Sequence, residues 1–203
     1  SSGAATLAAA TTTIQTLLAS DASARTINLA GQTLRLGTVG GVLQPATSGG
    51  LTIGSSANDG FLTAGTNANV AGELLLINHS ANPLVINSAI ASNGTAAIAL
   101  TKSGAGTVNL AGTNRLGAVY VNDGTMNLLS DNSLGAVTVV GGSLVFGSGG
   151  SHTLGGTLLI NGGTVSINGP VTSGSELQMN TLSGSRSVLY VATNLTASRI
   201  RAA

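Results

Sequence analysis

Residues 107–124 read TVNLAGTNRLGAVYVNDG, and residues 125–142 read TMNLLSDNSLGAVTVVGG. Ten of these 18 positions are identical, and the two copies align without a gap. A unit this short cannot bury a core alone, and a period of about 20 residues is typical of solenoids, in which each repeat forms one layer and stacks on the next. The repeat therefore predicts an elongated protein built from successive coils.

The pattern continues past these two copies. Residues 143–163 keep the template with three additional residues in the middle, and residues 164–167 begin a fourth, looser copy. Each copy carries two short runs typical of strands, TVNL and AVYV in the first copy. Alternate side chains of a strand point to opposite faces, and one face of both runs is apolar in every copy. We expect this face to line the interior of the solenoid.

The connections between the runs decide how the strands pair. They are only about 3–8 residues long, whereas a helical crossover needs a dozen or more. Equivalent runs that recur along the chain favour stacking of like on like, which is a parallel arrangement. The predicted fold class is therefore all-β, a parallel β-helix with 18–21 residues per regular coil. An antiparallel sandwich or barrel is the alternative. At about 20 residues a coil, the chain gives roughly ten layers and a rod of about 50 Å.

The composition agrees with a repetitive β protein. Gly accounts for 30 of 203 residues, charged residues for 6% and aromatic residues for 2%, and there is no Cys. Ordinary domains have about 25% charged residues. The lower fraction here suits a solenoid, because like charges at equivalent positions of coils about 4.8 Å apart would repel. The net charge of +1 gives no electrostatic case for binding nucleic acid or an anionic membrane. No apolar stretch approaches the roughly 18 residues of a membrane span.

We expect one continuous solenoid over residues 1–203, because no linker rich in Pro or charge divides the chain. Residues 1–20 form an Ala/Thr-rich lead-in, for which a frayed terminus is the alternative to a first strand. Residues 21–106 hold less regular coils, residues 107–191 the regular repeats, and residues 192–203 a tail. Strands outside the regular zone are expected at 13–18, 26–29, 33–36, 51–53, 73–77, 83–86 and 97–100.

The repeat register places like residues directly above one another in neighbouring coils. Three pairs result: Asn109 over Asn127, Asn114 over Asn132, and Val119 over Val137. Stacked amides can hydrogen-bond along the rod axis, each donating to the next. His152 aligns with the second Asn pair and is expected to continue a column of turn residues. These ladders are predicted to be structural.

Residues with catalytic or metal-binding potential are sparse. The chain has six acids, and no acid stacks on another where the register can be read, although carbohydrate-cleaving sites need clustered carboxylates. The Gly-Gly pairs lack the Asp of Ca²⁺-binding nonapeptide repeats. His79 and His152 are far apart in sequence, and no Ser/His/Asp set or phosphate loop is recognisable. We therefore expect no catalytic, cofactor-binding or metal-binding residue, no cofactor and no enzymatic activity.

The middle of the chain resembles the autotransporter-associated β-strand repeat of bacterial type V secreted proteins. The resemblance rests on LTKSGAGTVNLAGTN at 100–114 and VNDGTMNL at 121–128. The matched positions are Leu100, Thr101, Lys102, Gly104, Gly106, Thr107, Gly112, Asn114, Gly124 and Thr125. At 115–118 this chain has Arg-Leu-Gly-Ala, where the family usually has Tyr-Thr-Gly-Gly. The resemblance implies a right-handed parallel β-helix that is exported and displayed outside the cell, and its motif carries no catalytic or binding residue.

These observations lead to one main expectation of function and two alternatives. The main one is a non-catalytic structural or adhesive β-solenoid on the bacterial cell surface, a stalk or filament segment of an autotransporter-like protein. The alternatives are a self-assembling extracellular fibre subunit and a carbohydrate-binding or carbohydrate-cleaving β-helix. Expected partners are further copies stacked end to end and a cell-surface or glycan ligand, with no nucleic acid and no membrane insertion by this segment.

Overall fold

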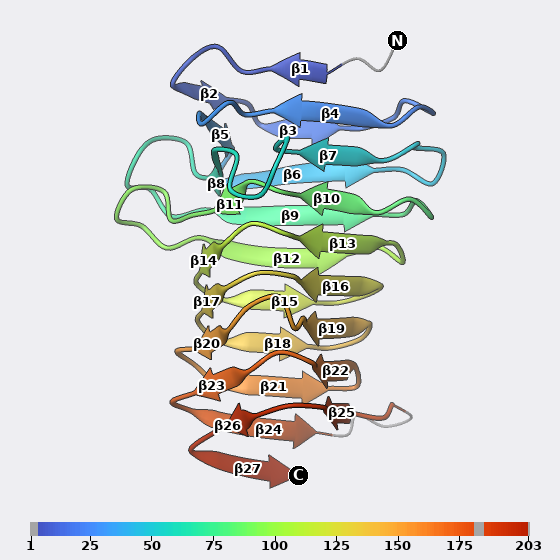
Figure 1. Ribbon diagram of the computed structural model, residues 1–203, viewed down its shortest axis with the longest axis vertical. Helices are drawn as coiled ribbons and strands as arrows, with labels where there is room; N and C mark the ends of the chain where they lie inside the picture. Colours follow the sequence, from blue (N-terminus) through green and yellow to red (C-terminus); the bar gives the residue numbers. More distant parts are fainter. Residues whose placement is uncertain (1–3, 181–184, 203) are drawn as a thin grey trace.

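Every regular element of the described chain is a β-strand, and the strands stack in parallel into a rod (Figure 1). The computed structural model describes residues 4–180 and 185–202. The solenoid has about nine coils of about 22 residues each. The all-β parallel solenoid predicted from the repeat is therefore confirmed. The prediction of roughly ten coils was slightly too high, because the loops of the less regular coils are longer than those of the repeats.

Each coil contributes one strand to each of three faces. The first face is a nine-stranded sheet: β1 (Ala4–Thr6), β4 (Arg25–Asn28), β7 (Leu51–Ile53), β10 (Leu84–Ile86), β13 (Thr107–Leu110), β16 (Thr125–Leu128), β19 (Ser143–Phe146), β22 (Thr164–Ile167) and β25 (Val188–Val191). The second face is also nine-stranded: β3 (Thr16–Leu18), β6 (Val39–Gln44), β9 (Glu73–Asn78), β12 (Ala99–Ser103), β15 (Val119–Val121), β18 (Val137–Val139), β21 (Leu158–Asn161), β24 (Glu176–Asn180) and β27 (Arg199–Ala202).

The third face consists of two shorter sheets, one after the other along the rod. The first four coils supply β2 (Thr11–Thr13), β5 (Thr33–Leu36), β8 (Phe61–Ala64) and β11 (Ala89–Ile90). The last five supply β14 (Asn114–Leu116), β17 (Asn132–Leu134), β20 (His152–Leu154), β23 (Val171–Ser173) and β26 (Leu195–Thr196). The lead-in is part of the rod, because its described residues carry β1, β2 and β3. The single strand expected at 13–18 is two short strands on different faces.

The third face corrects one expectation. The sequence suggested two strands per repeat, with Asn114, Asn132 and His152 in turns, but these three residues begin strands of a third sheet. These strands have three residues, and their central side chain is exposed while the outer two are buried. The first inward position is polar, so the apolar alternation that marks a strand is absent. Hydrogen bonding along the column satisfies the buried polar groups instead.

Aliphatic side chains stacked in columns fill the interior. In the first sheet Ile53, Ile86, Leu110, Leu128, Phe146 and Ile167 occupy one register position in successive coils, and all are fully buried. Burying each such side chain stabilises the fold by about 1.5–3 kcal/mol. The outward positions between them carry residues such as Asn109 and Asn127, which are half-buried. The inward and outward faces predicted from the repeat are therefore confirmed.

Glycine makes the turn from the second face to the first. Gly104, Gly124 and Gly142 take positive φ angles of 77°, 66° and 63° in successive coils. A Cβ atom at Gly124 would lie 2.4 Å from the carbonyl oxygen of Gly104. Both the backbone conformation and the close approach of neighbouring coils therefore require glycine at these turns.

Candidate functional site

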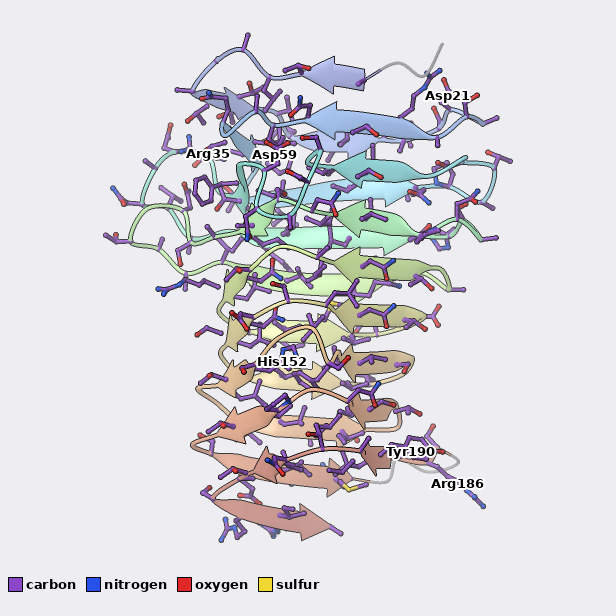
Figure 2. All side chains as sticks on the ribbon, in the orientation of Figure 1. Asp21, Arg35, Asp59, His152, Arg186 and Tyr190 are labelled. Atoms are coloured by element: carbon purple, nitrogen blue, oxygen red, sulfur yellow. The ribbon has the colours of Figure 1, made fainter. Side chains whose placement is uncertain are left out.

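The outer surface of the third face carries charged, aromatic and polar side chains. Because strand residues alternate, the positions between the buried ones point away from the rod. In the upper coils these outward residues include Arg35 and Phe61, and in the next coils Arg115, Ser133 and Thr153. Figure 2 places Arg35 in the upper part of the rod. The three sequence positions 35, 61 and 115 belong to coils two, three and five.

Three hollows follow one another along this face. The first, of about 260 Å³, includes Arg35, Phe61 and Asn93 in its lining. The second, of about 280 Å³, includes Phe61, Ile90 and Arg115. The third, of about 350 Å³, includes Arg115 and Asp131. Since Phe61 and Arg115 each line two of them, the hollows adjoin one another, and we call the row of three the third-face groove.

A loop at 54–60 forms one wall of the groove. The Asp59 carboxylate holds this loop by accepting hydrogen bonds from the backbone N–H groups of Ser55 (2.7 Å), Leu29 (3.2 Å) and Gly31 (3.2 Å). The Ser55 N–H bond is the main reason why the pKa of Asp59 lies below its usual 3.8, and desolvation opposes it. Asn58, at φ 61°, accepts a 2.7 Å hydrogen bond from the N–H of Thr113. The wall is therefore tied both to the coil above and to the coils below.

The opposite side of the groove is fixed by Asn93. Its buried side-chain amide donates hydrogen bonds to the carbonyls of Asn67 (2.6 Å) and Val70 (2.9 Å), which belong to the loop between β8 and β9. Its Oδ1 accepts a 3.1 Å hydrogen bond from Nε of Arg35. The loops at 65–72 and 92–97 project from the rod on this side (Figure 1). Asn93 thus joins one wall to an arginine of the groove and sets the orientation of that guanidinium.

The groove presents aromatic, charged and polar side chains. It combines an exposed aromatic ring, two guanidinium groups, and Asn, Ser and Thr side chains. Asp131 is held by a 2.8 Å hydrogen bond from the Ser151 N–H. Among residues 4–180 and 185–202, no group of three or more His, Cys, Asp or Glu is placed to hold a metal ion. The sequence does not reveal this groove, because the residues of the groove come from coils whose loops differ in length.

The ladders predicted from the repeat are present. Val119 pairs with Val137 in parallel register, and both are fully buried. Asn109 pairs with Asn127, and Nδ2 of Asn127 donates a 2.8 Å hydrogen bond to Oδ1 of Asn109. These contacts confirm that the two copies of equal length are successive coils.

The buried ladder of Asn114 and Asn132 extends into a longer chain of hydrogen bonds. The N–H of Ile90 donates to Oδ1 of Asn114 at 3.1 Å, and Nδ2 of Asn114 donates to Oδ1 of Asn132 at 2.8 Å. Nδ2 of Asn132 lies 3.0 Å from Nδ1 of His152, and Nε2 of His152 lies 2.9 Å from the carbonyl oxygen of Gly147. The amide can only donate to Nδ1, so the proton of the neutral ring is assigned to Nε2. Every donor in the chain then faces an acceptor.

The larger side chain of His152 fits because its coil has a wider loop. Five residues, 147–151, separate β19 from β20, whereas three residues, 111–113, separate the equivalent strands of the first copy. The ring also meets Phe146 edge-on, with centroids 5.2 Å apart. Figure 2 places His152 in the lower half of the rod. The expectation that it continues the Asn column is confirmed, although the column is buried within strands.

We expect the fold to lose stability as the pH falls below 6.5, through His152. Burial lowers the pKa of His152 below 6.5, against the opposing effects of the Gly147 carbonyl and the Asp131 carboxylate. The unfolded chain therefore takes up the proton first, and the folded state loses at most about 1.4 kcal/mol per pH unit. Protonated Nδ1 would also face the Asn132 amide donor. The free energy of unfolding in urea, measured from pH 7.5 to 5, checks this.

His152→Asn is the matched variant for this titration, because Asn continues the column with a side chain that does not titrate. The variant is expected to lose the pH dependence between 6.5 and 5, a range above the usual titration of carboxylates. An unchanged pH profile in His152→Asn would assign the titration to another group.

A buried lysine is the main interior feature that the sequence analysis did not identify. Lys102, the chain's only lysine, is 0% exposed and lies in register with Leu76 and Val121. Its Nζ donates hydrogen bonds to the carbonyl oxygens of Ser103 (3.0 Å), Gly104 and Asp123 (2.9 Å). Its inward position follows the alternation of inward and outward side chains that begins at Leu100. The residue also lies within the motif that resembles the autotransporter-associated repeat. Its long stem lies in an aliphatic column while its charge reaches the turn.

Comparisons with family models, curated proteins and solved structures gave no match for this chain. The resemblance to the autotransporter-associated repeat therefore rests on the residues quoted above. None of the described residues belongs to a helix of the length and apolarity needed to cross a membrane.

Proposed function

We propose that this protein is a non-catalytic structural and adhesive β-solenoid of the bacterial cell surface, serving as a stalk or filament segment of an autotransporter-like protein. The observation that carries the proposal is the unbroken stacking of the first two faces over nine strands each. Such stacking gives a stiff spacer of fixed direction, and its outer faces offer long regular surfaces for attachment. The repeat resemblance supports export and surface display.

The adhesive part of the proposal is supported by the third-face groove. Its exposed aromatic and arginine side chains are the kind of groups that anchor binding interfaces. They line a groove whose walls are fixed by hydrogen bonds of Asp59 and Asn93. A preformed surface of this kind loses little conformational entropy on binding.

Self-assembly into fibres is a second candidate, supported by exposed apolar side chains on the outer surface of β6. Val39 and Leu43 point outward on this strand and are 63% and 38% exposed. Contact with a second copy at this surface would bury them. Sedimentation velocity over a hundredfold range of concentration separates the candidates, because only a fibre subunit grows with concentration.

The proposed function is tested by display of the chain on bacterial cells. Cells that display it are expected to attach to polysaccharide-coated surfaces in greater number than cells that display an unrelated domain of similar size. The purified chain is expected to release no new reducing ends from the same polysaccharides. Release of reducing ends would contradict the non-catalytic role, and equal attachment of both cell types would contradict the adhesive one.

A further inference from the structure

The exposure of Phe61 is the first unexplained feature of the third-face groove. The chain has only two Phe residues, and the other, Phe146, is 0% exposed in the interior. Phe61 is 47% exposed and borders a strip formed by Ala89, Ile90 and Ala91. Small side chains along this strip leave the ring accessible from the groove. An accessible aromatic ring beside a low apolar floor can stack against a flat, partly apolar ligand.

The two arginines of the groove are the second feature. The ion pairs within residues 4–180 and 185–202 are Asp21 with Arg25 and Glu176 with Arg199, so neither groove arginine is paired to a carboxylate. The hydrogen bond found for the Arg35 side chain runs from its Nε to the neutral side-chain amide of Asn93. A guanidinium presents two parallel N–H donors to a carboxylate or sulfate and binds such groups bidentately. The groove therefore offers two anion-binding groups.

The acids near the groove are already engaged by the protein. Asp59 accepts hydrogen bonds from three backbone N–H groups and from the Ser55 hydroxyl. Asp131 lines only the third hollow, beyond Arg115. The stretch from Arg35 to Arg115 is thus the part of the groove with an excess of positive charge.

The geometry of this stretch favours a linear polymer. Arg35 belongs to β5 and Arg115 to β14, which are three strand steps apart along the third face. At about 4.8 Å per step this is about 14 Å, with Phe61 between the two charges. A ligand that reaches both arginines must therefore lie along the rod axis. A chain of sugar rings has this extended shape, and each ring has an apolar face of C–H groups that can stack on Phe61.

We propose that the third-face groove between Arg35 and Arg115 binds an acidic polysaccharide, with a sugar ring stacked on Phe61 and its anionic groups paired with the two guanidinium groups. This inference rests on the proposed adhesive function and names its ligand class. The anionic groups are carboxylates or sulfates, which the guanidinium fork accepts alike. Binding must weaken as salt is added, because the charges are exposed to solvent.

The test measures binding of the purified chain to polygalacturonate, to dextran sulfate and to neutral dextran by isothermal titration calorimetry. We expect binding to one or both anionic polymers and none to dextran. Phe61→Ala and Arg115→Gln are each expected to weaken binding about tenfold, the loss of one good contact. Comparison of the two anionic polymers tells carboxylate from sulfate recognition.

Two variants on the second face serve as matched controls. Tyr120→Ala removes an exposed aromatic ring, and Arg201→Gln removes an exposed arginine, both away from the groove. Both are expected to leave the affinity within about twofold of the parent, since neither side chain lines the groove. Melting temperatures of all four variants identify any loss of folding.

Three outcomes would overturn the ligand assignment: no binding to either anionic polymer, equal binding to dextran, or equal losses in groove and control variants. None of these affects the evidence for a rod. Conversely, binding through Phe61 accompanied by cleavage of the polymer would uphold the ligand class and overturn the non-catalytic function.

Discussion

Val137→Asp is expected to abolish the cooperative folding of the regular coils. Val137 is fully buried between Val119 and Leu158, its partners in the coils above and below. The substitution loses the burial of an apolar side chain and places a carboxyl group without a partner among aliphatic side chains. Burial would raise the pKa of this carboxyl group by several units, so the group would be protonated in the folded state. Together with the lost apolar burial, the expected loss in the free energy of unfolding is about 5 kcal/mol. This is a large part of the stability of a typical domain.

The measurement is urea unfolding followed by circular dichroism, with Thr138→Asp as the matched control. Thr138 is the next residue of β18, and its side chain points outward. Its replacement is expected to change the free energy of unfolding by less than about 0.5 kcal/mol. Similar losses in the two variants would contradict the assignment of inward and outward faces.

Asn132→Leu provides a second comparison within the interior. Leucine is apolar and of similar size, but it leaves the Ser130 carbonyl, Nδ1 of His152 and one donor of Asn114 without a partner. The expected loss is about 2–3 kcal/mol, the cost of unsatisfied buried groups, and the fold is retained. A loss equal to that of Val137→Asp would show that the ladder carries as much stability as the aliphatic columns.

Lys102→Met is expected to destabilise the chain by about 1–3 kcal/mol at pH 10, where the folded chain holds the lysine largely as the neutral amine and its burial carries little charge penalty. Methionine fills the aliphatic column, but it removes the donor shared by the carbonyls of Ser103, Gly104 and Asp123. Two of these carbonyls belong to the turn after β12 and the third to the turn of the next coil. The loss therefore falls on the contact between two coils, and thermal unfolding measures it.

The same lysine gives the chain a pH dependence in the alkaline range. Burial lowers the pKa of Lys102 from 10.5 to about 8, and the Asp123 carboxylate opposes this shift. Between these values the unfolded chain holds the proton and the folded chain releases it, so stability rises with pH by about 3 kcal/mol. Lys102→Met should lose this rise. The single lysine also allows its titration to be followed directly by NMR, and a pKa near 10.5 would contradict the burial of its charge.

The regular zone was predictable because its first two copies are equal in length. The pairs Val119–Val137 and Asn109–Asn127 follow from counting 18 residues, and the structure has that register. The strand at Asn114–Leu116 was missed because a three-residue strand with polar Asn inside shows no apolar alternation. The repeat predicts that Asn132 is the ladder partner of Asn114, but it does not predict that both residues belong to a third sheet.

The third-face groove was not predictable from the sequence. Arg35, Phe61 and Arg115 lie 26 and 54 residues apart, and only the lengths of the loops at 54–60, 65–72 and 92–97 determine that they share one face. Nothing in the composition of these loops fixes the strand register across them. The walls depend on specific hydrogen bonds of Asn58 and Asn93, which chain position does not reveal.

The division of the third face bears on how the rod responds to force. β11 and β14 belong to different sheets, so between the fourth and fifth coils only the first and second faces continue as strand ladders. On the third face the amide oxygen of Asn114 spans this level by accepting the N–H of Ile90. A pull applied along the long axis is therefore expected to open the rod first at this level, on the third face.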